Sequence, residues 1–208
     1  VWTSSELAAL SDDEVKLLLP KLRVVARALP MDKSRLVRLS QEMNLVVGMT
    51  GDGVNDSPAL KKADVGFAMG SGTEVAKEAG DIVILDDNFL SIKKAILYGR
   101  TIYNSICKFI VFQLTINFSA VAINFIAPFV GIDKPLTITQ ILWINLVMDT
   151  LAAIAFGGEP ALEKYLAETP KDRSAPIVSK KMLTTIVLGG AYMTLVAIFF
   201  YKSSFIAE

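Results

Sequence analysis

Two acidic side chains, Asp52 and Asp56, lie four residues apart in the glycine-containing segment Met49–Leu60. The segment follows an apolar run at residues 45–49, which is typical of a buried strand. Two carboxylates can hold Mg²⁺ while leaving coordination positions for water and for a phosphate oxygen. The pattern therefore predicts a site for Mg²⁺ and phosphate at the end of a strand.

Neighbouring residues suit the same chemistry. Gly51 and Gly53 would let backbone N–H groups approach an anion closely. Asn55 could donate a hydrogen bond to a phosphoryl oxygen. Lys33 could offset the negative charge that spreads over the phosphoryl oxygens during transfer. Asp-Gly and Asn-Asp pairs are also ordinary turn residues, so the whole segment, rather than any single pair, indicates a site.

Two further polar segments favour structural roles. Gly70–Thr73 has the composition of a phosphate cradle but lacks the lysine and spacing of a Walker loop, which favours a turn between a strand and a helix. Asp86–Asn88 follows a predicted strand and is interpreted as a helix cap and interdomain hydrogen-bonding site in preference to a metal site.

The elements that position these groups alternate between strand and helix patterns. Ser11 and Glu14 form a capping box for a helix that Pro20 ends. Ser57 is interpreted as an N-cap ahead of Pro58. The predicted strands are 22–29, 45–50, 65–69 and 81–85, and the predicted helices are 32–43, 57–62 and 73–79. This alternation predicts an α/β, Rossmann-like region over residues 1–90, with a parallel sheet covered on both faces and its site at the carboxyl ends of the strands.

Composition excludes several classes of function. The sequence has no histidine and one cysteine, Cys107, so histidine bases, histidine-ligated metals and internal disulfides are excluded. The formal net charge is zero, which implies no strong attraction to nucleic acid. The first residues lack the charged and apolar regions of a signal peptide, so none is expected.

The second half of the chain is much more apolar than the first. Residues 109–132 and 182–201 contain no charged side chain. Residues 136–158 contain one, Asp149. A helix needs about 20 apolar residues to cross a bilayer. The pattern predicts an all-α region of three transmembrane helices, the first two joined by the short loop 131–135 as a hairpin.

Basic residues predict how these helices are oriented. The segment 91–108 and the loop 159–181 carry the basic residues next to the spans, which are Lys93, Lys94, Arg100, Lys108, Lys164, Lys171, Arg173, Lys180 and Lys181. The positive-inside rule places both segments, and with them the phosphate site, in the cytoplasm. No strong helix breaker occurs between Ser91 and Pro128, so 91–108 is expected to be a stalk continuous with the first span.

Polar residues within the spans indicate a cargo. A charge at the position of Asp149 is costly in lipid and is a functional candidate by default. Asn145 lies on the same helix face, and Asn117 lies midway through the first span. Carboxylate and amide oxygens suit a hard cation, above all Ca²⁺. An interhelical hydrogen bond remains an equal alternative for Asn117. The other polar residues of the first span, Gln113, Thr115, Ser119 and Asn124, are interpreted as helix-packing residues.

Several of these segments resemble motifs of the P-type cation-transporting ATPases. Thr50–Leu60 is similar to the hinge motif of that family, and Ala26–Lys33 is similar to the segment whose lysine contacts the phosphoryl group. Leu142–Thr150 resembles the sixth transmembrane helix of calcium pumps. The segments 66–72, 86–89 and 99–104 also match. The resemblance implies a haloacid-dehalogenase-like phosphorylation domain, transmembrane helices five to seven, and the use of Mg²⁺ and ATP.

Two departures from the family pattern point to a subtype. Two-site pumps of the sarcoplasmic-reticulum type have glutamate where this chain has Ala120, and threonine where it has Met148. Both departures are similar to plasma-membrane-type and secretory-pathway-type calcium pumps. The resemblance thus implies a single cation site built from Asn117, Asn145 and Asp149.

The sequence contains no Asp-Lys-Thr-Gly-Thr phosphorylation motif and no Thr-Gly-Glu actuator loop. The resemblance therefore implies that the actuator, the nucleotide-binding domain and the other transmembrane helices are partners from the same pump, and that these residues alone neither hydrolyse ATP nor pump. Three alternatives stay open: a Ca²⁺/Mn²⁺ pump of the secretory-pathway type, a membrane-anchored haloacid-dehalogenase-type phosphatase, and a regulatory remnant without catalysis.

Overall fold

The structure is a computed structural model that describes residues 1–132, 135–172 and 174–203. The chain divides into two compact units. The first contains Val1–Ile96 and Glu168–Ala175, and the second contains Leu97–Ala167 and Pro176–Glu208.

The first unit begins with small elements that pack around one apolar core. In chain order they are β1 (Trp2–Thr3), α1 (Ser4–Ala8), α2 (Asp12–Leu18), the 3₁₀ turn η1 (Leu19–Lys21), β2 (Val25–Ala26) and α3 (Pro30–Glu42). Leu7, Val15 and Leu39 are buried together at the centre of this group. The predicted capping box is confirmed, because Ser11 Oγ accepts from Glu14 N at 3.4 Å and Ser11 N donates to Glu14 Oε2 at 2.8 Å.

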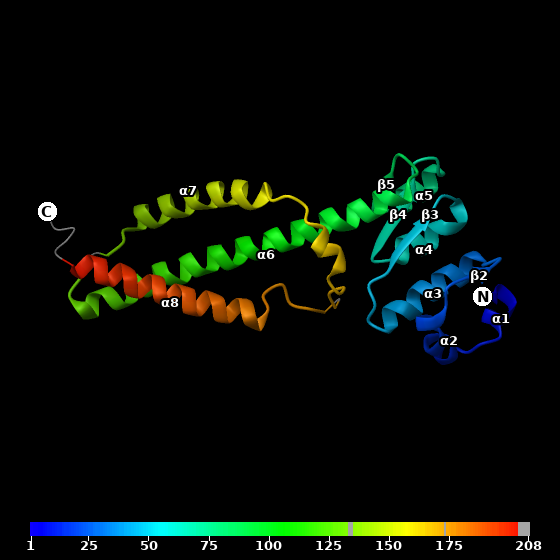
Figure 1. Ribbon diagram of the computed structural model, residues 1–208, viewed down its shortest axis with the longest axis horizontal. Coiled ribbons are helices and arrows are strands. Elements are labelled where there is room, and N and C mark those ends of the chain that lie inside the picture. The colour runs from blue at the N-terminus through cyan, green and yellow to red at the C-terminus, as the bar shows by residue number, and fades with distance from the viewer. Residues whose placement is uncertain (133–134, 173, 204–208) are drawn as a thin grey trace. The chain divides into compact units, whose positions relative to one another are not determined.

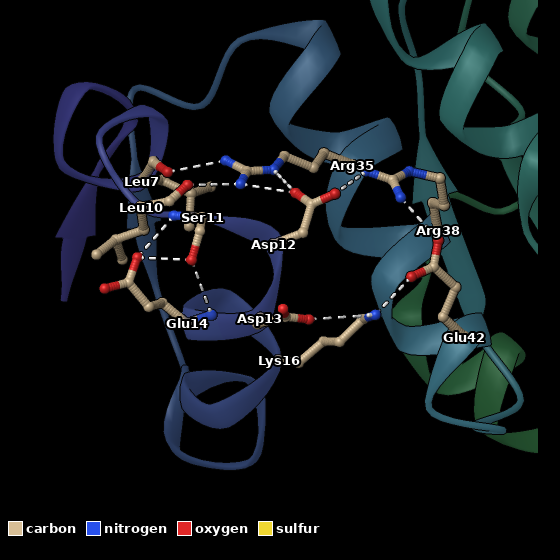
Figure 2. A network of polar contacts seen from close by, with 10 residues as sticks. All are labelled: Leu7, Leu10, Ser11, Asp12, Asp13, Glu14, Lys16, Arg35, Arg38 and Glu42. Atoms are coloured by element: carbon tan, nitrogen blue, oxygen red, sulfur yellow. Dashed lines mark hydrogen bonds and ion pairs between the residues drawn. The ribbon is translucent and has the colours of Figure 1, made fainter.

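A network of ion pairs and hydrogen bonds joins these helices, as Figure 2 shows. Asp12 lies between two arginines of α3, accepting from Arg35 Nε at 2.8 Å and from Arg38 Nη2 at 2.6 Å. Glu42 accepts from Arg38 and also pairs with Lys16 of α2 at 2.7 Å. The network therefore ties α2 to α3, the helix that carries Lys33.

The second part of this unit is a three-stranded parallel sheet. Its elements are β3 (Gly48–Gly51), η2 (Val54–Asp56), α4 (Ser57–Lys62), β4 (Val65–Met69), α5 (Glu74–Ala79) and β5 (Ile82–Ile84). The strand order is β3-β4-β5, and both pairings are parallel. The segment from Asp52 to Asp56 follows the carboxyl end of β3, as predicted.

Two predicted strands differ from the structure. The strand predicted at 22–29 is reduced to β2, which pairs with β1 in a separate two-stranded sheet instead of joining the larger one. Arg27 has a positive φ of 55°, which ends the extended conformation there. The strand predicted at 45–50 begins only at Gly48, after Asn44 at φ 63°. Both shortenings occur beside a residue in the left-handed region.

The second unit is built from long helices (Figure 1). They are α6 (Phe89–Ile126), which starts within the first unit, η3 (Ala127–Val130), α7 (Ile138–Gly157), η4 (Glu163–Ala167) and α8 (Lys180–Lys202). The expectation of one continuous helix of more than 30 residues from Ser91 is confirmed, since α6 contains 38 residues. Of the predicted interhelical loop, Asp133 and Lys134 lie outside the described residues, as does Arg173.

Three helices among the described residues are long and apolar enough to cross a membrane: α6 with η3, α7 and α8. The aromatic rings of Phe112 and Phe156 join α6 to α7, with centroids 5.9 Å apart. Gly190 of α8 lies against the ring of Phe118, where a Cβ would come within 3.2 Å of Cγ. Small residues thus allow close packing of α8 on α6, as is common between membrane helices.

Candidate functional site

The loop after β3 is shaped by the contact between Gly51 and Asp56. The Asp56 carboxylate folds back over Gly51, and a Cβ at position 51 would lie 2.9 Å from Asp56 Cγ and 3.0 Å from Oδ2. No side chain larger than hydrogen fits there without displacing the carboxylate. Gly53 is different, because the nearest atom to a Cβ would be Asn55 N at 4.0 Å. Of Gly51 and Gly53, Gly51 alone lies against a side chain of the candidate site.

Lys33 and Asp56 are brought together by the fold. The Lys33 ammonium donates to Asp56 Oδ1, and the residue Asp56 is only 7% exposed. Lys33 is the fourth residue of α3, whose first turn is anchored by Asp32. The Asp32 carboxylate accepts from Leu29 N at 2.9 Å and from Ser4 Oγ at 2.6 Å. The predicted phosphate-contacting lysine thus lies directly beside one of the predicted metal-binding carboxylates.

Asp52 is held by its backbone. Its carbonyl oxygen accepts from Thr73 N at 2.8 Å, and Gly72 packs so closely that a Cβ there would lie 2.8 Å from the same oxygen. The side chains of Asp52 and Asn55 are exposed. Among the described residues, no hydrogen bond or ion pair joins either side chain to Lys33 or Asp56. The backbone position of Asp52 is therefore fixed, whereas the side chains of Asp52 and Asn55 are exposed to solvent.

This arrangement fits a hard, oxygen-seeking cation. Lys33 engages Oδ1 of Asp56, whereas no described residue engages its Oδ2, and the exposed Asp52 carboxylate follows the same strand. Two carboxylates with open positions are a typical donor set for Mg²⁺ that also binds a phosphate. A cluster of three or more histidine, cysteine, aspartate or glutamate side chains is absent from the described residues. The remaining ligands would have to come from water or substrate.

The two segments interpreted as structural serve that purpose. Asp87 accepts from Ser71 N at 3.0 Å, which fixes the turn Gly70–Thr73, and this backbone N–H lowers the pKa of the Asp87 carboxyl. Asn88 Oδ1 accepts from Leu90 N at 2.9 Å at the start of α6. Thr73 caps α5 by accepting from Ala76 N at 3.3 Å. The prediction of caps and a turn is confirmed.

The predicted N-cap at Ser57 is wrong. Ser57 is the first residue of α4, the N-cap is Asp56, and no side chain caps this helix. The Ser57 hydroxyl is buried without a hydrogen-bond partner among the described residues. Sequence reasoning missed this group because a serine before a proline has the usual signature of a cap.

The intramembrane residues lie on α6 and α7. Oδ1 of Asp149 is buried and has no hydrogen-bond partner among the described residues, so one carboxylate oxygen is available for a ligand. Asn145 lies one turn earlier on the same face. Neither asparagine is bonded to Asp149: the described side chains show no hydrogen bond linking Asn117, Asn145 and Asp149.

The Phe112–Phe156 contact sets the level of α6 against α7. Asn117 lies five residues beyond Phe112, and Asp149 lies seven residues before Phe156. At about 1.5 Å per residue in helices of opposite direction, the two side chains differ by only about 3 Å in height. Asn145 is about 6 Å further along the axis. The predicted cation ligands are thus spread over about 9 Å along the helix axis, between one and two helical turns.

Comparison with known proteins finds a separate family match in each half of the chain. Residues 38–96 match the family of haloacid dehalogenase-like hydrolases, and residues 133–207 match the family described as cation transporting ATPase, C-terminus. The chain is 48% identical to human plasma membrane calcium-transporting ATPases 1 and 4, over 94% of its own length and 16% of theirs. The chain thus spans about one sixth of the length of these relatives.

The relative from chicken, plasma membrane calcium-transporting ATPase 1, is also 48% identical over 94% of the chain. A solved structure of the catalytic domain of the CPx-ATPase CopB-B is 33% identical, covers 39% of this chain and 34% of that one, and has a TM-score of 0.33. The family matches confirm a haloacid-dehalogenase-like α/β region followed by membrane helices. The chain belongs to the P-type cation-transporting ATPases and is a multi-pass membrane segment similar to part of the plasma-membrane calcium pumps.

Proposed function

We propose that this chain is part of an ATP-driven calcium pump, in which it supplies half of the phosphorylation site and most of a single intramembrane Ca²⁺ site. Residues 1–90 would belong to the phosphorylation domain, 91–108 to the stalk, 109–132, 136–158 and 182–201 to the spans, and 159–181 to a cytoplasmic loop. The observation that carries the proposal is the buried, unpartnered Oδ1 of Asp149 in a helix that could cross a membrane.

At the phosphorylation site, Asp52 and Asp56 would hold Mg²⁺, which supplies charge neutralisation to the phosphoryl group when bound. The nucleophilic aspartate would come from another segment of the full-length protein. Lys33 would orient a phosphoryl oxygen while remaining paired with the Asp56 carboxylate, as their contact supports. Asn55, which is exposed beside them, would donate its amide hydrogen to a second oxygen.

In the membrane, Asn117, Asn145 and Asp149 would ligate one Ca²⁺, the transported substrate. Asp149 would contribute the charge and the asparagines neutral oxygens, a set that suits a hard cation. Release on the other side requires that the affinity falls in one state of the pump. α6 supports such coupling, because it is continuous from Phe89 to Ile126 and includes Asn117.

The test is formation of an acid-stable phosphoenzyme from ATP by the full-length protein, in membranes, as free Ca²⁺ is varied at constant Mg²⁺. We expect phosphorylation to require Ca²⁺ and to disappear when Ca²⁺ is chelated. Activation by K⁺ or H⁺ without Ca²⁺ would overturn the calcium assignment. Equal activation by Mn²⁺ would favour the secretory-pathway type with the same ligands, and hydrolysis of phosphate esters without any transported ion would favour a phosphatase.

A further inference from the structure

Gln113 of α6 differs from the other polar side chains of its helix. Its Oε1 is buried and has no hydrogen-bond partner among the described residues, a property it shares with Asp149 Oδ1. By contrast, Thr115 donates to Val111 O at 2.7 Å, and Asn124 Nδ2 donates to Ala120 O at 2.8 Å. The packing role predicted for these residues fits Thr115 and Asn124, because their side chains form hydrogen bonds with backbone carbonyls of the same helix. It does not explain the unpartnered oxygen of Gln113.

Gln113 also lies in line with the proposed cation ligands. It precedes Asn117 by four residues, so the two amides share one face of α6. Measured from the Phe112–Phe156 contact, Gln113 is about 1.5 Å along the axis, Asn117 about 7.5 Å and Asp149 about 10 Å. The amides of Gln113 and Asn117 therefore lie at successive levels of α6 between the aromatic contact and the level of Asp149.

These spacings decide what Gln113 can do. Ca²⁺ holds its oxygen ligands at about 2.3–2.6 Å. The proposed ligands Asn117, Asp149 and Asn145 span about 9 Å along the axis, and Gln113 lies about 6 Å outside that span, about 15 Å from Asn145. One ion cannot reach both Gln113 and Asn145, so Gln113 can meet the ion only before or after the proposed ligand set holds it.

We propose that Gln113 Oε1 is a transient ligand for the transported divalent cation, one step from the Asn117–Asp149 site toward the Phe112–Phe156 contact. The amide oxygen replaces part of the hydration shell that the ion loses as it passes between the helices. The proposal rests on the calcium-pump function proposed above. It assigns Gln113 a part in how the ion reaches or leaves the site, which is separate from the ligand set that holds the ion.

The test compares Gln113→Leu, Gln113→Glu and the control Asn124→Leu in the full-length protein. We expect Gln113→Leu to raise the free Ca²⁺ for half-maximal phosphorylation by about three- to tenfold, the equivalent of one net polar contact, and to slow dissociation or binding of ⁴⁵Ca²⁺. Gln113→Glu, which keeps an oxygen, should restore the Ca²⁺ dependence to within about twofold of wild type. Asn124→Leu should change neither property.

Two results would overturn the proposal. One is a Gln113→Leu pump with the Ca²⁺ dependence and ⁴⁵Ca²⁺ kinetics of Asn124→Leu. The other is a Gln113→Glu pump as defective as Gln113→Leu, which would show a packing role. Phosphorylation from inorganic phosphate reports folding, and Gln113→Met, of similar length, replaces the leucine variant if that variant is unfolded. If Ca²⁺ fails to activate even the wild-type protein, the calcium-pump function fails instead.

Discussion

The Asp56 carboxylate lies directly over Gly51, leaving no space for a methyl group at position 51. A Cβ there would come 2.9 Å from Asp56 Cγ. We therefore expect Gly51→Ala to displace the carboxylate and to reduce phosphorylation of the full-length protein, from ATP or from inorganic phosphate, at least about tenfold. Gly53→Ala is the matched control, because its nearest neighbour is 4.0 Å away, and it should retain phosphorylation within about twofold. Equal loss in both variants would contradict this account of the loop.

The contact between Lys33 and Asp56 predicts a second effect. Lys33→Met removes the proposed hydrogen-bond donor to the phosphoryl group and leaves the buried Asp56 carboxylate without its cation. We expect phosphoenzyme formation to fall by about 10²–10³-fold, the usual effect of losing one preorganised donor. Lys61→Met on the exposed part of α4 removes the same charge elsewhere and should leave the rate unchanged. A Lys33→Met protein with wild-type rates of phosphorylation would show that Lys33 serves only as a partner for Asp56.

The packing of α8 on α6 predicts a stability effect. Gly190→Leu would place a side chain where a Cβ already comes within 3.2 Å of the Phe118 ring, and overpacking of this kind costs about 1–3 kcal/mol. We expect a lower midpoint of thermal unfolding in detergent. Gly157→Leu at the end of α7 is the control, since a Cβ there meets nothing within 4 Å. If the two variants unfold at the same temperature, α8 does not pack on α6 through Gly190.

The network in Figure 2 predicts a pH dependence. Hydrogen bonds from Arg38 and then Arg35 lower the pKa of Asp12, and those from Lys16 and then Arg38 lower the pKa of Glu42. Carboxyls whose pKa is lower in the folded state bind fewer protons there. Their stabilising effect is complete above their unfolded pKa values, about 4, and is lost as the pH falls through the folded values.

Hydrogen exchange of α2 and α3 in the full-length protein measures this effect. Protection should be constant from pH 7 to about 5 and should fall at lower pH once intrinsic exchange is corrected, less steeply in Asp12→Asn. Added salt should weaken protection at neutral pH, because these pairs are exposed to solvent. An unchanged acid profile in Asp12→Asn would mean that the network adds no stability.

Local signals in the sequence predicted the elements with strong caps or long apolar runs. The Ser11 capping box, the Thr73 cap, the strand at 65–69 and the long helix after Ser91 all agree with the structure. β1 was not predicted, because two residues carry no periodic signal. Its pairing with β2 depends on a contact between distant parts of the chain, which also explains why the strand expected at 22–29 was misplaced.

The candidate site shows the same division. Residue types and spacing were enough to predict the roles of Lys33, Asp52 and Asp56, and these roles remain predictions. The sequence predicted the same role for Gly51 and Gly53, whereas in the structure the Asp56 side chain lies against Gly51 only. The sequence also predicted the same packing role for Gln113 as for the other polar residues of the first span. Whether a buried amide finds a partner depends on which way its helix faces and on what packs there, neither of which is encoded locally.

Asp149→Asn in the full-length protein is the decisive test of whether Asp149 binds the transported ion. The substitution keeps size and polarity but removes the charge of the buried carboxylate. We predict that Ca²⁺ no longer activates phosphorylation from ATP, while phosphorylation from inorganic phosphate persists and is no longer suppressed by Ca²⁺. Ca²⁺ transport and Ca²⁺-activated phosphorylation at wild-type levels in Asp149→Asn would contradict the assignment of this residue to the transported ion.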